Sequence, residues 1–246
     1  MRLRTLKLTI AYDGTAFAGW QMQAGQRTVQ GAIEDALRPI DGTRVIVHAA
    51  GRTDSGVHAA GQVVSFSLKS SIDCDALVRA VNVRLPADVR VMTAEDAPEG
   101  FNARFDARHK TYHYAILTDT VVPPTIRHFV WHVPHPLDTE AMNSAAAVLR
   151  GEHDFAAFQA TGGDVITTRR ELVSSAVVPA ADRLTYEVTG TGFLRHMVRN
   201  IVGTLVDIGR GRMPAIRMAE ILASRNRAQA SATAPPQGLT LWRVDY

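Results

Sequence analysis

The pattern of apolar and polar residues predicts strands in both halves of the chain. From Leu6 to Tyr12 every second residue is apolar, which is typical of a half-buried strand. Similar patterns predict further strands over residues 44–49, 62–68, 89–93, 110–117, 172–178, 184–189 and 239–246.

Apolar residues at helical spacing predict helices between these strands. Thr28, Asp73 and Asp138 each precede such a segment, and short side chains that carry an oxygen are preferred N-caps. The clearest helix begins near Phe193, buries one apolar face and ends at Gly209. The order of strands and helices is irregular. This favours an α+β fold with a mixed, largely antiparallel sheet over a doubly wound fold.

The length of the chain and a seam near residues 100–106 predict two lobes. We expect an N-terminal α/β lobe over residues 1–105 and a C-terminal α/β lobe over residues 106–246. No segment approaches the roughly 18 uninterrupted apolar residues of a membrane span. The single cysteine, Cys74, allows no internal disulfide. We therefore expect a cytoplasmic protein that does not enter the membrane.

Charge adds a modest indication of a nucleic-acid partner. The formal net charge is only +3, but 24 of the 27 basic residues are arginine, whose planar guanidinium suits phosphates and base edges. A GC-rich genome would give the same preference, so the local distribution is more informative. Between Arg195 and Arg227 there are seven arginines against only Asp207 and Glu220, which indicates a stripe that could face a polyanion.

The segment around Asp54 is the first candidate for chemistry. Arg52 lies two residues before it, and Gly51 and Gly56 bracket the loop. Such a turn can hold a carboxylate in an open position with a guanidinium close by. Most Asp-Ser-Gly segments are only turns, however, so the pattern alone does not indicate catalysis.

Three further side chains could serve a site, each with a simpler alternative. Arg195 and Arg199 are expected one helical turn apart, opposite the apolar face, where either could reach a carboxylate or phosphate or simply face solvent. Tyr112 is expected to share a strand face with Tyr114, where core packing explains it equally well.

Other classes of site lack their sequence patterns. His128, His132 and His135 are close in sequence, but neither a cysteine nor an acidic residue is spaced to complete a zinc site with them. The glycines near Asp13 form neither a Walker loop nor a dinucleotide fingerprint, and there is no nucleophile elbow. The sequence thus predicts neither a metal nor a cofactor.

Beyond these patterns, the chain resembles the bacterial tRNA pseudouridine synthase A family over nearly its whole length. Residues 51–59, Gly-Arg-Thr-Asp-Ser-Gly-Val-His-Ala, resemble the signature loop of that family, which usually has alanine in place of Ser55. The 162–170 segment matches the family poorly. Further matches occur in the same order along the chain, at residues 12–15, 19–21, 101–105, 110–114, 151–155, 193–200 and 238–246.

The resemblance implies a pseudouridine synthase-like fold, with two α/β lobes sharing the sheet and a central basic cleft. It implies isomerisation of uridines 38, 39 and 40 in the anticodon stem-loop of tRNA, without a cofactor, by a homodimer. Asp54 corresponds to the catalytic aspartate. The resemblance further implies that Arg199 pairs with Asp54, that Tyr112 stacks on the flipped uracil, and that Arg52 fills the vacated space or grips the adjacent backbone.

Two other functions remain alternatives at this stage. A non-catalytic RNA-binding protein would use the same arginines, with Asp54 only a turn residue. An RNA uracil N-glycosidase would break the same first bond but release free uracil.

Overall fold

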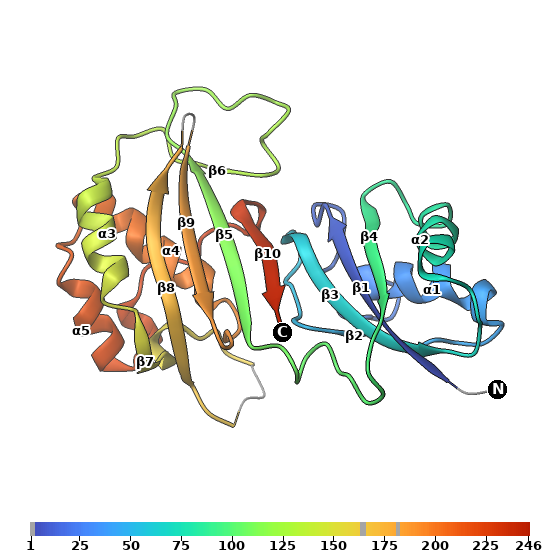
Figure 1. The fold of residues 1–246 in the computed structure, drawn as a ribbon. Helices are drawn as coiled ribbons and strands as arrows, with labels where there is room; N and C mark the ends of the chain where they lie inside the picture. Colours follow the sequence, from blue (N-terminus) through green and yellow to red (C-terminus); the bar gives the residue numbers. More distant parts are fainter. Residues whose placement is uncertain (1–2, 163–165, 181–182) are drawn as a thin grey trace. The chain divides into compact units, whose positions relative to one another are not determined.

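The computed structural model describes residues 3–162, 166–180 and 183–246. The chain divides into two compact units (Figure 1). Unit 1 consists of Met1–Arg108 and Thr240–Tyr246, and unit 2 consists of His109–Leu239.

Unit 1 is built on a mixed sheet whose strands are β1 (Arg4–Tyr12), β2 (His48–Ala49), β3 (His58–Leu68), β4 (Val89–Asp96) and β10 (Leu239–Asp245). Strand β1 pairs antiparallel with both β3 and β4, β2 pairs antiparallel with β3, and β10 joins β3 in parallel. Alternate residues of β1, including Leu6, Leu8 and Ile10, are fully buried, as the alternation predicts.

The helices of unit 1 begin where their capping residues predict. In α1 (Val29–Asp41) the side chain of Thr28 accepts from the N–H of Gly31, and Gly42 closes the helix in the left-handed region. In α2 (Cys74–Asn82) the side chain of Asp73 accepts from the N–H of Ala76.

The strands of unit 2 are β5 (His109–Leu117), β6 (Trp131–His132), β7 (Gly151–Asp154), β8 (Arg169–Pro179) and β9 (Leu184–Gly190). Strands β5, β9, β8 and β7 are neighbours in that order and pair antiparallel, while β6 joins β5 in parallel. Three helices pack together beside this sheet (Figure 1), α3 (Thr139–Ala147), α4 (Met197–Gly209) and α5 (Arg217–Ser224). Short 3-10 helices lie at Ala156–Phe158, Arg227–Gln229 and Pro236–Gly238.

These elements confirm the α+β class with a mixed, largely antiparallel sheet. The strand predicted over residues 44–49 is confined to His48–Ala49. The helix predicted from Phe193 begins four residues later, at Met197, because His196 adopts a left-handed conformation with φ 59°. Strand β7 and helix α5 have no counterpart in the sequence prediction. In the described ranges, none of the helices combines the length and apolar character that a membrane span requires.

The division into units differs from the predicted lobes at the C-terminus. The first boundary falls between residues 108 and 109, close to the predicted 105, but Thr240–Tyr246 belongs to unit 1 rather than to the C-terminal lobe of residues 106–246. Two contacts explain this. Thr240 and Leu241 pair with β3, and the Tyr246 hydroxyl donates to the carbonyl of Ala103 at 2.8 Å.

Candidate active site

Asp54 lies in the loop that connects β2 to the start of β3 in unit 1. The N–H of Val57 donates to the Asp54 carbonyl at 3.1 Å, and Gly56 has φ 77°, so the chain turns sharply immediately after the carboxylate. The Asp54 residue is partly exposed. The loop therefore holds a carboxylate at the surface of unit 1 on a fixed turn.

The segment after β1 contacts this loop closely along its backbone. The N–H of Trp20 donates to the carbonyl of Thr53 at 3.0 Å. A Cβ atom on Gly14 would lie 2.0 Å from the carbonyl oxygen of Val57, and one on Gly19, whose φ is 97°, would lie 2.7 Å from that of Thr53. Only glycine permits both approaches. This explains why the glycines of residues 12–21 accompany the loop of residues 51–59, although the two segments are distant in sequence.

Buried polar side chains support the loop from below. The hydroxyl of Tyr12 lies 2.8 Å from that of Thr53, the residue before Asp54. Gln62 on β3 donates to the carbonyl of Gly51 at 2.7 Å and accepts from its N–H at 3.4 Å. Burial raises the pKa of Tyr12 to about 12, against the opposing effect of hydrogen bonds with Thr53 and Gln62. Tyr12 therefore stays protonated at neutral pH and can donate.

His58 fastens the far end of the loop. Its ring is buried, and Nδ1 accepts from the N–H of Gly14 at 3.0 Å. Nδ1 also lies 3.2 Å from Oδ1 of Asp13, which accepts from the N–H of Thr15 at 2.9 Å. The polar residues Gln62, Tyr12 and His58 were not identified as site residues from the sequence.

Two details concern residues beside Asp54. Arg52 is exposed, and in the described ranges its guanidinium forms no ion pair. The guanidinium that the sequence predicts close to Asp54 is therefore not paired with that carboxylate. Ser55 uses its hydroxyl to donate to the carbonyl of Phe17 at 3.1 Å. The residue that departs from the family pattern thus adds one bond to the loop rather than disturbing it.

Tyr112 lies on β5 of unit 2, opposite Val188 of β9. It shares its face with Tyr114, as predicted, and is 7% exposed. Its ring packs edge-to-face against Phe193, with centroids 4.9 Å apart. Tyr112 is therefore an aromatic ring held firmly on a strand, with little of its surface exposed.

Arg199 lies in the first turn of α4 in unit 2. Its Nε donates to the carbonyl of Ala234 at 2.8 Å, and the N–H of Ala234 donates to the carbonyl of Arg199 at 3.1 Å. Arg195 precedes the helix, contrary to the prediction that both arginines lie on it, and donates to the carbonyl of Thr161 at 3.0 Å. Arg199 and Arg195 are thus held in different ways.

The segment that holds Arg199 is itself organised by a buried amide. Asn200 donates to the carbonyl of Phe158 at 2.7 Å, while its Oδ1 accepts from Thr233 at 2.7 Å and from Arg227 at 3.1 Å. Sequence reasoning overlooked Asn200, although a polar residue next to an apolar helical face was the available signal.

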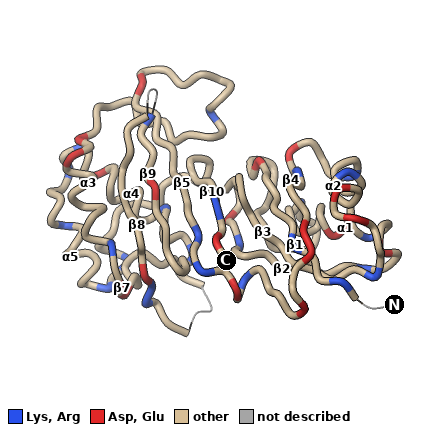
Figure 2. The backbone as a smooth tube through the Cα atoms, viewed as in Figure 1, with Lys and Arg blue, Asp and Glu red and all other residues tan. Residues whose placement is uncertain are grey.

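The seven arginines between Arg195 and Arg227 do not form a uniform basic stripe. Arg227 serves the Asn200 network, and three others pair with carboxylates, in the pairs Arg212–Asp207, Arg217–Glu220 and Arg225–Asp154. Figure 2 shows basic and acidic residues interspersed in each unit. Four of the seven arginines are therefore engaged in contacts within unit 2.

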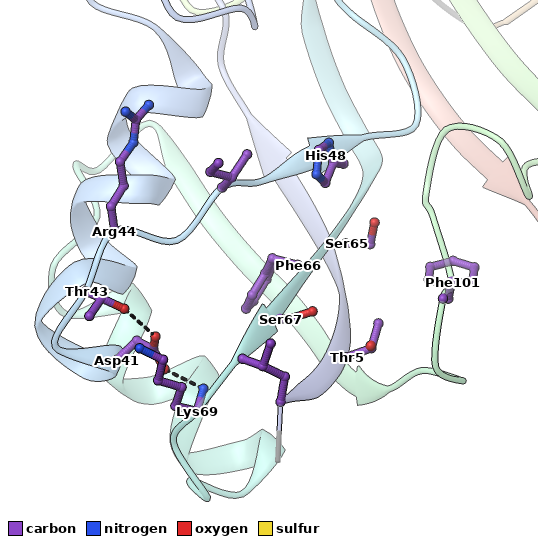
Figure 3. A pocket seen from close by; sticks show the side chains of 13 residues that line it. Thr5, Asp41, Thr43, Arg44, His48, Ser65, Phe66, Ser67, Lys69 and Phe101 are labelled. Carbon is purple, nitrogen blue, oxygen red and sulfur yellow. Dashed lines mark hydrogen bonds between the residues drawn. The ribbon is translucent and has the colours of Figure 1, made fainter. Parts of the chain in front are cut away.

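A hollow of about 440 Å³ lies elsewhere on unit 1 (Figure 3). Asp41 at its rim accepts from the backbone N–H of Lys69 at 2.6 Å and from the Thr43 hydroxyl at 2.9 Å. Partial burial opposes ionisation, but these hydrogen bonds outweigh it and lower the pKa of Asp41. Neither Asp54 nor Arg52 lines this hollow.

Comparisons with known proteins identify the family of the chain. A family profile described as tRNA pseudouridine synthase matches residues 8–106 and 145–246. Relatives named tRNA pseudouridine synthase A include that of Pelobacter propionicus, 44% identical over 99% of this chain and 100% of the relative. That of Myxococcus xanthus is 46% identical over 98% of this chain and 91% of the relative, and that of Halalkalibacterium halodurans is 44% identical over 96% and 90%. With matches that extend over both units, the chain belongs to the tRNA pseudouridine synthase family.

Proposed function

We propose that this protein is a tRNA pseudouridine synthase that isomerises uridines 38, 39 and 40 of the anticodon stem-loop. Membership of the family supports the reaction, and the observation that carries it is the carboxylate of Asp54 on a turn that two glycine contacts and a buried polar network hold in place. The bond between N1 and C1′ breaks, the uracil rotates, and C5 bonds to C1′. One proton leaves C5 and one is gained at N1, so the product is an isomer and the reaction consumes no cofactor.

Each predicted site residue has a proposed role in this reaction. Asp54 acts as an ionised nucleophile or base. Arg199 pairs with it, which favours the charged carboxylate and fixes its direction. Tyr112 stacks on the flipped uracil and assists removal of the C5 proton. Arg52, exposed beside Asp54, fills the space that the nucleotide leaves or grips the adjacent backbone.

Delivery of the uridine follows from the chemistry of RNA. A base stacked inside a stem cannot be reached by a side chain, so it must be extruded, which costs a few kcal/mol. Arginine contacts to phosphates offset that cost, and we therefore expect tRNA binding to weaken steeply with salt. We further propose a cytoplasmic homodimer that binds through a basic cleft.

Pseudouridine mapping tests the proposal. The purified protein is incubated with anticodon stem-loop transcripts that carry uridine at positions 38, 39 and 40, and pseudouridine is detected by carbodiimide labelling. Label at these positions is the expected result. Binding without label would favour the non-catalytic RNA-binding alternative, and free uracil in the mixture would favour the N-glycosidase.

A further inference from the structure

The turn at residues 102–106 in unit 1 is attached to the sheet through both backbone groups of one buried residue. The N–H of Ala103 donates to the Ser65 hydroxyl at 2.9 Å, and its carbonyl accepts from the Tyr246 hydroxyl at 2.8 Å. Ala103 is fully buried. The turn is therefore fixed from two directions, by β3 and by the C-terminal residue.

The same turn is also closed on itself. Oδ1 of Asn102 accepts from the N–H groups of Arg104 at 2.9 Å and of Phe105 at 3.3 Å. The N–H of Asp106 donates to the Asn102 carbonyl at 3.0 Å, and the Asp106 carboxylate accepts from the N–H of Asn102 at 2.8 Å. These bonds fix the backbone that carries Arg104 and Phe105.

This rigid turn presents an aromatic ring and a cation to solvent. Phe105 is 77% exposed, and the guanidinium carbon of Arg104 lies 5.6 Å from the centre of its ring. In the described part of the chain no carboxylate pairs with Arg104. Arg27 offers a contrast, since it lies 4.1 Å from the ring centre of Phe17 but is bound by both carboxylate oxygens of Asp88 at 2.8 Å.

We propose that Arg104 and Phe105 form an RNA contact, in which the ring stacks on an unpaired base and the guanidinium binds an adjacent phosphate. The inference deepens the proposed function and rests on it for the identity of the RNA. A base can stack on any exposed aromatic face, and a fixed turn loses little freedom on binding. The uncompensated charge of Arg104 favours a polyanion over an apolar protein surface as the partner that contacts this turn.

Binding is measured with the Asp54→Asn variant, so that turnover does not alter the tRNA. In that background Phe105→Leu keeps an apolar side chain but removes the ring, and Phe105→Tyr keeps the ring. Loss of base stacking predicts binding weaker by about 5- to 100-fold for the leucine variant and a change below about twofold for the tyrosine variant. Arg104→Ala should lower the slope of log affinity against log salt by about one.

Arg38→Ala is the matched control for charge, because Arg38 is exposed and paired with Asp35. It should leave both affinity and salt slope near those of the parent. The proposal is overturned if Phe105→Leu binds tRNA as tightly as the parent, or if its weaker binding is accompanied by a change of oligomeric state in sedimentation. In the second case the turn contacts another copy of the chain. Because the readout is affinity, it is independent of whether the wild-type protein forms pseudouridine.

Discussion

Tyr12 and Tyr186 form a matched pair that tests whether the network below the Asp54 loop serves catalysis. Both rings are buried, and each hydroxyl lies near one other hydroxyl, Thr53 at 2.8 Å for Tyr12 and Ser175 at 2.9 Å for Tyr186. Tyr12→Phe and Tyr186→Phe each remove one oxygen. They differ in that only the first loosens the residue beside Asp54, and in that it also removes a hydrogen bond with Gln62.

The two substitutions should cost similar stability. Removing one partner of a buried hydrogen bond costs about 1–3 kcal/mol, because the remaining hydroxyl stays buried away from water without a hydrogen-bond partner. Urea unfolding should show a loss of this size in both variants. The reaction itself should separate them, since a displacement of about 1 Å near the reacting atoms can lower the rate about 100-fold.

The assay compares single-turnover pseudouridine formation with tRNA affinity in both variants. We expect Tyr12→Phe to lower the rate roughly 10- to 100-fold, with affinity nearly unchanged, and Tyr186→Phe to leave both near wild type. If the two variants lose stability equally and also retain equal rates, the network is only part of the core and the reasoning is refuted.

Three further predictions follow from the structure. Gly14→Ala would place Cβ 2.0 Å from the Val57 carbonyl oxygen, so the loop must shift. We expect a stability loss of about 1–3 kcal/mol in urea unfolding together with a slower reaction. Wild-type stability and rate would contradict the close approach. Arg199→Lys keeps the charge but not the fork, so a large loss of single-turnover rate with modest loss of tRNA affinity is expected, and an unchanged rate would show that the reaction does not require the guanidinium fork. The pKa of Tyr12 is raised to about 12, so between about pH 10 and 12 the unfolded chain releases a proton that the folded protein retains. The free energy of unfolding should therefore fall as pH rises through this window, and it should fall less steeply in Tyr12→Phe. Identical slopes in the two proteins would contradict the raised pKa.

Local features of the fold were predictable from the sequence. Thr28, Asp73 and Asp138 each accept a backbone N–H at the start of a helix, as predicted, because a cap depends on residues three positions away. The alternation in β1 likewise identified its buried face. Helix caps and strand alternation can be predicted because each depends on interactions between residues close in sequence.

Features that depend on distant partners were not predictable. Thr240–Tyr246 follow unit 2 in sequence but belong to unit 1, since they pair with β3 and reach Ala103, more than a hundred residues earlier. The sequence alone does not distinguish Gln62 from other strand residues, because its role depends on hydrogen bonds to Gly51. The importance of Asp54 came from resemblance to a family, because a turn of this composition is not by itself a catalytic signal.

The most direct test of the account is the rate of pseudouridine formation by Asp54→Asn under single-turnover conditions, with the variant in excess over an anticodon stem-loop transcript. Asparagine nearly matches aspartate in shape but cannot ionise, and it keeps the backbone carbonyl that accepts from the N–H of Val57, so the turn should persist. We predict that the variant binds the transcript and forms no detectable pseudouridine. Formation at a rate near that of the wild type would show that this carboxylate does not perform the chemistry.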